Sequence, residues 1–439
     1  MLYFVFRSHS PALDPSPPIH ACPPSKSIFN NSNTSSMASS SSASAASGAS
    51  AAATAAPQDA LLHAADLLFA TQAAGQVAAG SRAALEDVIK KEMLVGWLAV
   101  CEQELGWMHD EQLANELESA CKAKTTKLAE AVLIAKEKHG QVEVLEAELA
   151  VALHQAKTGS RDKISAVWAV PDLKTVSTGK RIDMYLEGAR LGFAWNDFSQ
   201  VRTGLDEAGK LLESGGDWDR RNRLKIYNGL RAMVSRDFKK ASAEFLSGLA
   251  TFTSDELFAY DRFCSYALVT SLVALDRVDL KSKVIDSPEV VAVLDGVKPD
   301  SPLAAAGRLI ASLYECRYRD FMVELLIAND VLLADRYLNR HARWFLREMR
   351  VKAYAQFLTS YKSVRLAWMA EAFGVSMHFM DQQLSQFIAL NRFAAKIDKV
   401  SGIVETNRPD TSNAKFNQVI KQGDALLNKV QKLARAIQV

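Results

Sequence analysis

The sequence predicts a mainly α-helical fold: a tetratricopeptide-like helical-repeat solenoid that runs into a winged-helix module and ends in a long C-terminal helix. Three observations predict it. Only five of the 12 prolines follow residue 58, and a proline inside a helix costs about 3 kcal/mol, so this stretch is free to be helical almost throughout. Apolar anchors recur about every 40 residues in the middle of the chain. Apolar residues near its end alternate in steps of four and three.

Residues 1–58 are expected to be a disordered, low-complexity extension. Residues 38–56 contain only Ala, Ser, Gly and Thr, and such a segment has no large apolar groups to offset the entropy lost on ordering. Met37 is hypothesised to be the true start, with residues 1–36 belonging to an over-extended gene prediction. The five cysteines are widely spaced and odd in number, which favours reduced thiols in an intracellular protein.

An N-terminal helical region is expected over residues 59–180. Its apolar residues recur at helical spacing, for example Leu85, Val88 and Ile89, and later Leu113 and Leu117. Helices with one apolar face need other helices to cover it, so each stripe is interpreted as core. No apolar run reaches the roughly 20 residues that span a bilayer, so no membrane contact is expected.

Tetratricopeptide-like repeats are expected over residues 181–242, with the same spacing continuing beyond them. Asn196-Asp197-Phe198 and Arg236-Asp237-Phe238 each open a helix, and every position of the second helix is displaced by 40 from the first. The anchor recurs at Asp279-Leu280, Asp320-Phe321 and Ser360-Tyr361. A second helix lies between anchors, at Leu224–Val234 and Phe258–Leu275. Two helices in a 40-residue period are typical of a helical solenoid.

A winged helix is expected over about 360–406. Its parts are a helix at Val364–Phe373 ended by Gly374, a second helix capped by Ser376, and two β-like runs at Ala395–Val400 and Ile403–Thr406. Glycine suits the position after a helix, and serine suits the position before one. The second helix, Met377–Leu390, has no Lys or Arg and contains Asp381. It cannot neutralise phosphates, so we expect no nucleic-acid partner.

The final segment, residues 412–439, is predicted to be a helix that enters a bundle with other proteins. A seam with steps of four and three is formed by Phe416, Ile420, Gly423, Leu427, Val430, Ala434 and Ile437. This is a heptad pattern, and a helix of this length would reach ~40 Å. Packing onto the chain's own solenoid is the alternative.

Five arginines are predicted to step along one helix face at Arg336, Arg340, Arg343, Arg347 and Arg350. They are interpreted as a solvated face or as a docking stripe for an acidic neighbour, because the guanidinium group suits carboxylates within a chain and between chains.

Several motifs resemble the PCI family, which is named for the proteasome lid, the signalosome and translation initiation factor three. They are Gly215–Lys225, Tyr314–Tyr318, Arg347–Arg350, Met369–Gly374, Lys396–Val400, Glu405–Asp410 and Val430–Leu433. Among PCI proteins they most resemble a proteasome lid subunit, with a PCI domain over 243–411. The resemblance implies a scaffold in the cytoplasm and nucleus, and partners that are other lid PCI subunits and the lid's metalloprotease pair. A scaffold of the signalosome or initiation factor is the alternative, and a nucleic-acid adaptor is less favoured.

The sequence offers no catalytic, cofactor-binding or metal-binding residues to nominate. The eight histidines include no His-x-His pair, HExxH and GxSxG are absent, and Ser177-Thr178-Gly179-Lys180 lacks the upstream glycine of a phosphate loop. The net charge of +2 is too small to attract polyanions globally. We therefore expect a protein without enzymatic activity or cofactor.

Overall fold

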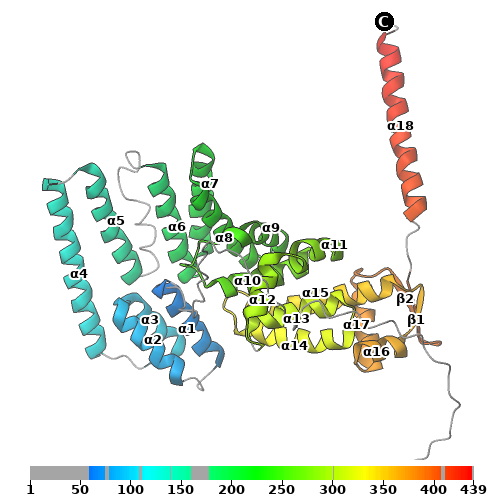
Figure 1. The fold of residues 1–439 in the computed structure, drawn as a ribbon, viewed down its shortest axis with the longest axis horizontal. Helices are drawn as coiled ribbons and strands as arrows, with labels where there is room; N and C mark the ends of the chain where they lie inside the picture. Colours follow the sequence, from blue (N-terminus) through cyan, green and yellow to red (C-terminus); the bar gives the residue numbers. More distant parts are fainter. Residues whose placement is uncertain are drawn as a thin grey trace, which may run out of the picture. The chain divides into compact units, whose positions relative to one another are not determined.

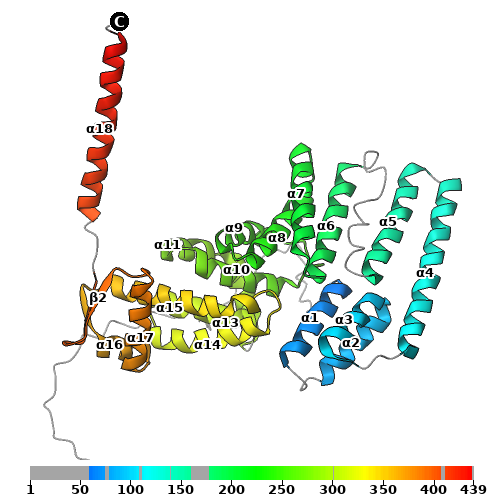
Figure 2. The ribbon, with the colours of Figure 1, turned by 180° about the vertical axis from the view of Figure 1, so that it is seen from behind.

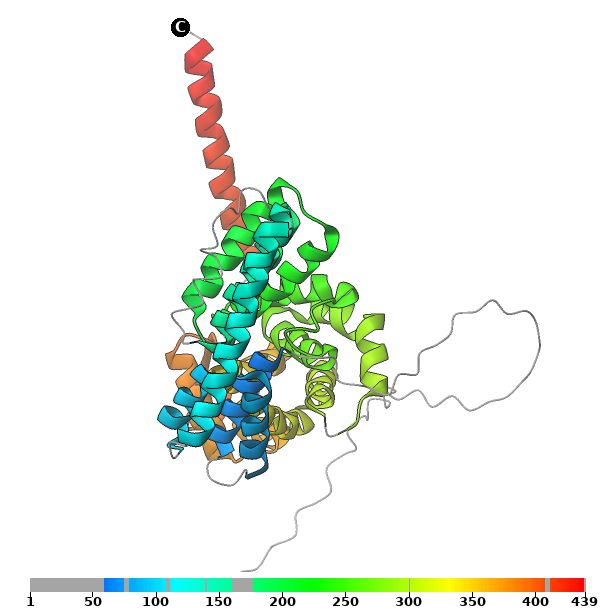
Figure 3. The same ribbon diagram turned by 90° about the vertical axis from the view of Figure 1, so that its left-hand side faces the viewer.

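The computed structural model describes residues 59–74, 79–107, 111–138, 140–159, 177–299, 301–406 and 411–437. The predicted disorder of residues 1–58 and the hypothesis about Met37 lie outside them. The N-terminal helical region consists of α1 (Ala60–Ala74), α2 (Ala79–Glu92), α3 (Val95–Leu105), α4 (Glu111–Lys138) and α5 (Gln141–Thr158). α4 pairs with α5, and α3 packs against α4 near one of its ends (Figures 1 and 3). None of the described helices has the length and apolarity to cross a membrane.

The next helices pack in successive pairs and form the predicted solenoid (Figure 1). They are α6 (Thr178–Ala194), α7 (Phe198–Ser214), α8 (Trp218–Val234), α9 (Phe238–Gly248), α10 (Tyr260–Ala274), α11 (Arg277–Leu280), α12 (Pro288–Gly296), α13 (Pro302–Tyr314), α14 (Tyr318–Ala334) and α15 (Ala342–Thr359). α6 packs on α7, α8 on α9 and α13 on α14. A single helix pair cannot bury its own apolar face. Each pair therefore covers the apolar face of the next pair in the stack.

The turn inside a repeat has the same backbone geometry three times. Asn196, Arg236 and Cys316 all have φ between 56° and 66°, in the left-handed region. In each case the N–H of the next residue donates to the carbonyl five residues earlier, at 2.8–2.9 Å. This arrangement closes the end of one helix, and the Asp197 and Asp237 side chains then cap α7 and α9. The 40-residue period is therefore a repeat of structure.

Two of the five predicted anchors are wrong, and a third is displaced, because Asp320-Phe321 lies inside α14, which begins at Tyr318. Asp279-Leu280 ends the four-residue helix α11, and the chain continues as a π-helical turn over Lys281–Ile285. Tyr361 opens no helix, because strand β1 (Ser363–Arg365) follows it. The repeat loses its regularity at the third anchor and ends at the fifth, where the winged helix begins.

The core of the solenoid is dense and rich in aromatic side chains. The ring centroids of Phe245 and Phe263 lie 5.5 Å apart edge to face, and Phe252 stacks on Phe263 at 4.8 Å. A Cβ added at Gly229 of α8 would lie 2.5 Å from Phe245 Cε1. Glycine is therefore required where α8 and α9 approach each other.

The winged helix is confirmed, with one strand that the sequence did not predict. It contains β1, α16 (Leu366–Phe373), α17 (Met377–Ala389), β2 (Ala395–Asp398) and β3 (Ile403–Thr406) (Figure 2). The sheet order is β1-β3-β2, with both pairs antiparallel and Val364 opposite Val404. Val364 is thus in a strand and does not begin a helix. Gly374 has φ 66° and ends α16 as predicted, and Ser376 caps α17.

The last helix, α18 (Thr411–Ile437), begins within one residue of the predicted segment 412–439 and continues to the last described residue. Every side chain of α18 whose exposure is described is exposed. Its apolar face has thus no cover within the described part of the chain.

Candidate interaction surfaces

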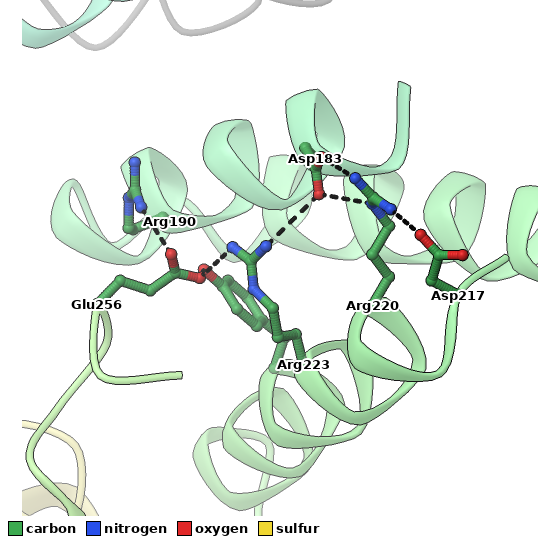
Figure 4. Close-up of polar contacts among 7 residues, drawn as sticks. Asp183, Arg190, Asp217, Arg220, Arg223 and Glu256 are labelled. Atoms are coloured by element: carbon green, nitrogen blue, oxygen red, sulfur yellow. Dashed lines mark hydrogen bonds and ion pairs between the residues drawn. The ribbon is translucent and has the colours of Figure 1, made fainter. Parts of the chain in front are cut away.

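An ion-pair network joins successive repeats around Glu256 (Figure 4). Arg223 Nη2 donates to Glu256 Oε1 at 2.6 Å, and the Tyr227 hydroxyl donates to the same oxygen at 2.7 Å. Arg190 of α6 donates to Glu256 Oε2 at 3.3 Å and pairs with Asp59 through Nε at 2.6 Å. Burial alone would raise the pKa of Glu256, but the hydrogen bonds from Arg223 and Tyr227 and the nearby positive charges lower it. The carboxylate therefore stays ionised and holds α6, α8 and the segment before α10 together.

The motif Gly215–Lys225 supplies the other half of this network. Arg220 holds both oxygens of Asp183 on α6, at 3.0 and 2.8 Å, and also bonds to Asp217. Arg223 lies 3.5 Å from Asp183 Oδ1 and so bridges Asp183 and Glu256 (Figure 4). The two-point contact of a guanidinium group with a carboxylate fixes orientation as well as distance. The charged residues of this motif thus fix the packing of α6 against α8.

A second charged cluster attaches α1 to the solenoid. Arg262 of α10 pairs with Asp66 of α1 at 2.5 Å and with Asp335 at 3.3 Å. The Tyr266 hydroxyl donates to Asp335 Oδ2 at 2.6 Å. Arg336 approaches Asp66 at 3.6 Å. Both carboxylates therefore have cationic partners within the chain.

The prediction that five arginines share one helix face is wrong. Arg336 lies in a turn and Arg340 in a 3-10 turn, so only three of the five lie on α15. The Arg336 side chain is 5% exposed and donates to the carbonyls of Phe193 and Ala194 at the end of α6. Its positive charge therefore stabilises a helix C-terminus inside the molecule, where a partner cannot reach it.

The remaining four arginines differ in their surroundings. Arg340, Arg343 and Arg347 are exposed. Arg350 is half-buried, donates to the Leu346 carbonyl at 3.2 Å and to Gln383 Oε1 at 2.9 Å, and lies over the Phe379 ring. Its role as a docking residue, like that of the three exposed arginines, stays a prediction.

The winged helix has two open sheet edges. β3 lies in the centre, so β1 and β2 are the edge strands. An edge strand exposes unpaired backbone groups that can pair with a strand of another protein. α17, which would enter the groove of DNA in a nucleic-acid-binding winged helix, buries Met380, Leu384 and Phe387. Its polar face supplies no lysine or arginine.

The seam on α18 is wider than predicted. Phe416, Ile420, Leu427, Val430 and Ile437 are between 56% and 75% exposed. Three further apolar residues, at 419, 426 and 433, are exposed beside them at intervals of seven. If Ile420 is heptad position a, these three occupy position g. An apolar face over a, d and g is typical of a helix within a multi-helix bundle, whereas a two-stranded coil needs only a and d.

Reactive or metal-binding groups do not gather in the described residues. No cluster of three or more His, Cys, Asp or Glu side chains there could hold a metal ion. Burial raises the pKa of the Cys101 thiol to about 12 and that of Cys264 to about 11. Both thiols are therefore protonated and unreactive near neutral pH, as expected of small core residues.

Comparison with known proteins gives matches along most of the chain. A family model described as 26S proteasome subunit RPN7 matches residues 110–283, a PCI domain model matches 324–408, and a model of the RPN7/PSMD6 C-terminal helix matches 417–437.

Curated relatives agree with these matches. The 26S proteasome non-ATPase regulatory subunit 6 of Oryza sativa subsp. japonica is 44% identical over 328 residues, which are 75% of this chain and 83% of that protein. The 26S proteasome regulatory subunit RPN7 of Saccharomyces cerevisiae is 42% identical over 75% of this chain and 77% of its own length. COP9 signalosome complex subunit 1 of Arabidopsis thaliana is 29% identical over 46% of this chain and 45% of its own.

Proposed function

The chain belongs to the family of the 26S proteasome regulatory subunit RPN7, and we propose that it is a non-catalytic scaffold of the regulatory-particle lid. In this role it supports lid assembly, and thereby ubiquitin-dependent protein degradation, through PCI–PCI contacts and a C-terminal helix bundle. The observation that carries the proposal is the uncovered apolar face of α18. A lone amphipathic helix is marginally stable in water, so this face needs partner helices.

The proposed partners are other PCI subunits of the lid and its metalloprotease pair, in the cytoplasm and the nucleus. The open edges of β1 and β2 support side-by-side association of winged helices, because backbone pairing there needs no particular charge. Nucleic acid and membrane have no part in the proposal. The signalosome alternative is less favoured, since that relative is less similar and matches under half of the chain.

The absence of an enzymatic step is also part of the proposal. Similar proteins are named non-ATPase regulatory subunits. The buried, protonated thiols of Cys101 and Cys264 and the ionised, partnered Glu256 support it, because a catalytic group needs access to a substrate.

Substitution of the seam tests the proposal. We expect Ile420→Ser, Leu427→Ser and Val430→Ser, combined in the full chain, to lower co-purification with the lid at least about tenfold, because each burial contributes ~1.5–3 kcal/mol. Lys421→Ser with Asn428→Ser, at position b on the polar face, is the matched control. Deletion of residues 412–439 should act like the triple variant and leave the solenoid folded by circular dichroism. A triple variant that enters the lid as well as the control would refute the bundle.

A further inference from the structure

A groove lies where α14 and α15 meet the winged helix, and no residue of α18 lines it. It has a volume of about 350 Å³ and is lined by Met322, Leu325 and Leu326 of α14, Leu346 of α15, and Val375 and Phe379 of the winged helix, with Arg350 and Ser376 beside them. The lining is thus mostly apolar, with a cation at one wall. Grooves of this composition take amphipathic segments of other proteins.

The groove continues into an exposed apolar strip on α14. Val323, Leu326, Ile327 and Leu333 are each 39–59% exposed. Val323 is three and four residues from Leu326 and Ile327, and Leu326 is seven residues from Leu333, so these side chains follow one side of α14. Leu326 belongs to both the strip and the groove. The combined surface is therefore long enough for a helix of a few turns.

Arg350 lines the groove and has no carboxylate partner among the described residues. Arg350 hydrogen-bonds only to neutral oxygens, and burial lowers its pKa. Arg343 forms no ion pair with any described residue, and Arg347 lies only within 4.0 Å of Glu348, which already pairs with Arg392. Arg343, Arg347 and Arg350 are three or four residues apart and share one face of α15. A carboxylate from outside would satisfy the half-buried guanidinium group.

The same charges exclude this chain's own C-terminal helix as the occupant. α18 carries Lys415, Lys421, Lys429, Lys432 and Arg435 against the single acidic residue Asp424. Such a helix would place positive charge beside the arginines of α15. The α18 helix of a second copy is excluded for the same reason.

We propose that this groove binds an acidic amphipathic helix of a neighbouring protein, whose apolar residues fill the groove and whose Asp or Glu side chain pairs with Arg350. The proposal adds a docking surface to the scaffold role and does not depend on the α18 bundle. A bidentate contact with Arg350 would fix the register of the bound helix, and Arg343 and Arg347 would select against basic segments.

Photo-crosslinking in cells that assemble the native complex tests the proposal. The full chain carries p-benzoylphenylalanine at Leu326, and a matched chain carries it at Val278 on α11, which is also exposed. We expect a Leu326 adduct whose peptide has apolar residues at helical spacing with Asp or Glu among them. Arg350→Met should lower its yield about tenfold, as expected for a lost charged hydrogen bond, with partial recovery in Arg350→Lys.

Two variants separate binding from folding. Arg202→Met, an exposed arginine on α7, should leave the adduct unchanged. Arg343→Glu with Arg347→Glu changes only exposed side chains and should also lower the yield, even if Arg350→Met affects stability. Circular dichroism of each variant should match the wild type.

Other results would overturn the inference. One is a Leu326 adduct with nucleic acid, with α18 or with a segment that lacks carboxylates. Another is an adduct yield that neither Arg350→Met nor the double charge reversal changes. A third is the absence of a Leu326 adduct in a chain that co-purifies with the lid. An adduct with an acidic helix in a chain that does not co-purify with the lid would support the groove as a docking site and refute the proposed function.

Discussion

Glu256→Gln should weaken the joint between α6 and α8. The carboxylate accepts hydrogen bonds from Arg223 and Tyr227 on one oxygen and from Arg190 on the other. A glutamine oxygen can still accept the first two, but a bond to a charged acceptor is worth ~1 kcal/mol more than a neutral one. The glutamine NH₂ group would replace the oxygen that accepts from Arg190, so two hydrogen-bond donors would face each other. We expect a loss of about 2–4 kcal/mol in the free energy of local unfolding at pH 7.

The effect should depend on pH with a defined sign. The folded pKa of Glu256 lies below the ordinary value of 4.5, so the unfolded chain takes up the proton first as the pH falls. The stabilisation is therefore complete above pH 4.5 and is lost as the pH falls through the lowered pKa. The difference between wild type and Glu256→Gln should shrink towards zero in that range, because a protonated carboxyl is also uncharged.

Hydrogen exchange of the α8 amides is the suitable assay, since a solenoid opens locally and global unfolding is not all-or-none. We expect protection to fall about 30- to 1,000-fold at pH 7, which corresponds to 2–4 kcal/mol. Glu207→Gln, which breaks the exposed pair with Lys210 on α7, should have no measurable effect. The reasoning fails if Glu256→Gln resembles that control, or if its effect persists at acid pH.

Three further experiments test the packing at Gly229, the burial of Arg336 and the reactivity of the Cys101 thiol. Gly229→Ala should lower the free energy of local unfolding, measured by hydrogen exchange, by ~1–3 kcal/mol, because the added Cβ meets a ring carbon at 2.5 Å. Gly209→Ala, with nothing within 4 Å, should raise it by ~0.5–1 kcal/mol. Arg336→Met should destabilise the fold by ~2–4 kcal/mol and Arg343→Met should not, and equal melting temperatures would contradict the assignment of Arg336 to the interior. Cys101 should react with a thiol reagent at pH 8 only after denaturation, and peptide mass spectrometry of modified native protein would expose an error.

The sequence predicted the features that depend on local signals. Asp197 and Asp237 cap the helices that begin at Phe198 and Phe238, and a cap acts within three residues of itself. α18 was predicted nearly residue by residue, because its pattern extends over many turns. The resemblance to the PCI family is confirmed by the matching family models.

Features that depend on distant contacts were missed. Val364 looked like the first residue of a helix, but it pairs with Val404, 40 residues later along the chain, and this pairing draws it into β1. A three-residue strand has too few side chains for alternation to be visible. The segment Ser363–Arg365 is a strand because β3 pairs with it.

The arginines show how a regular spacing can mislead. Arg336 and Arg340 continue the steps of four and three, yet Asp335 accepts hydrogen bonds from the N–H groups of Tyr337 and Leu338 and turns the chain before α15 begins. An aspartate that bonds to the backbone two residues later is a common turn signal, and it could have been recognised. The hydrogen bond from Arg336 to the end of α6 could not have been recognised from the sequence, because it joins residues about 140 positions apart.

The paired and unpaired groups of the described residues indicate where this chain meets other proteins. Its buried charges, such as Glu256 and Arg262, are paired within the chain and fix one repeat against the next. The a, d and g face of α18, by contrast, is exposed, and Arg350 hydrogen-bonds only to neutral oxygens among the described residues. An enzyme concentrates strained or perturbed groups in a cleft that substrate can enter. A chain that pairs its buried charges and leaves apolar and charged surface open gains stability by association with partners.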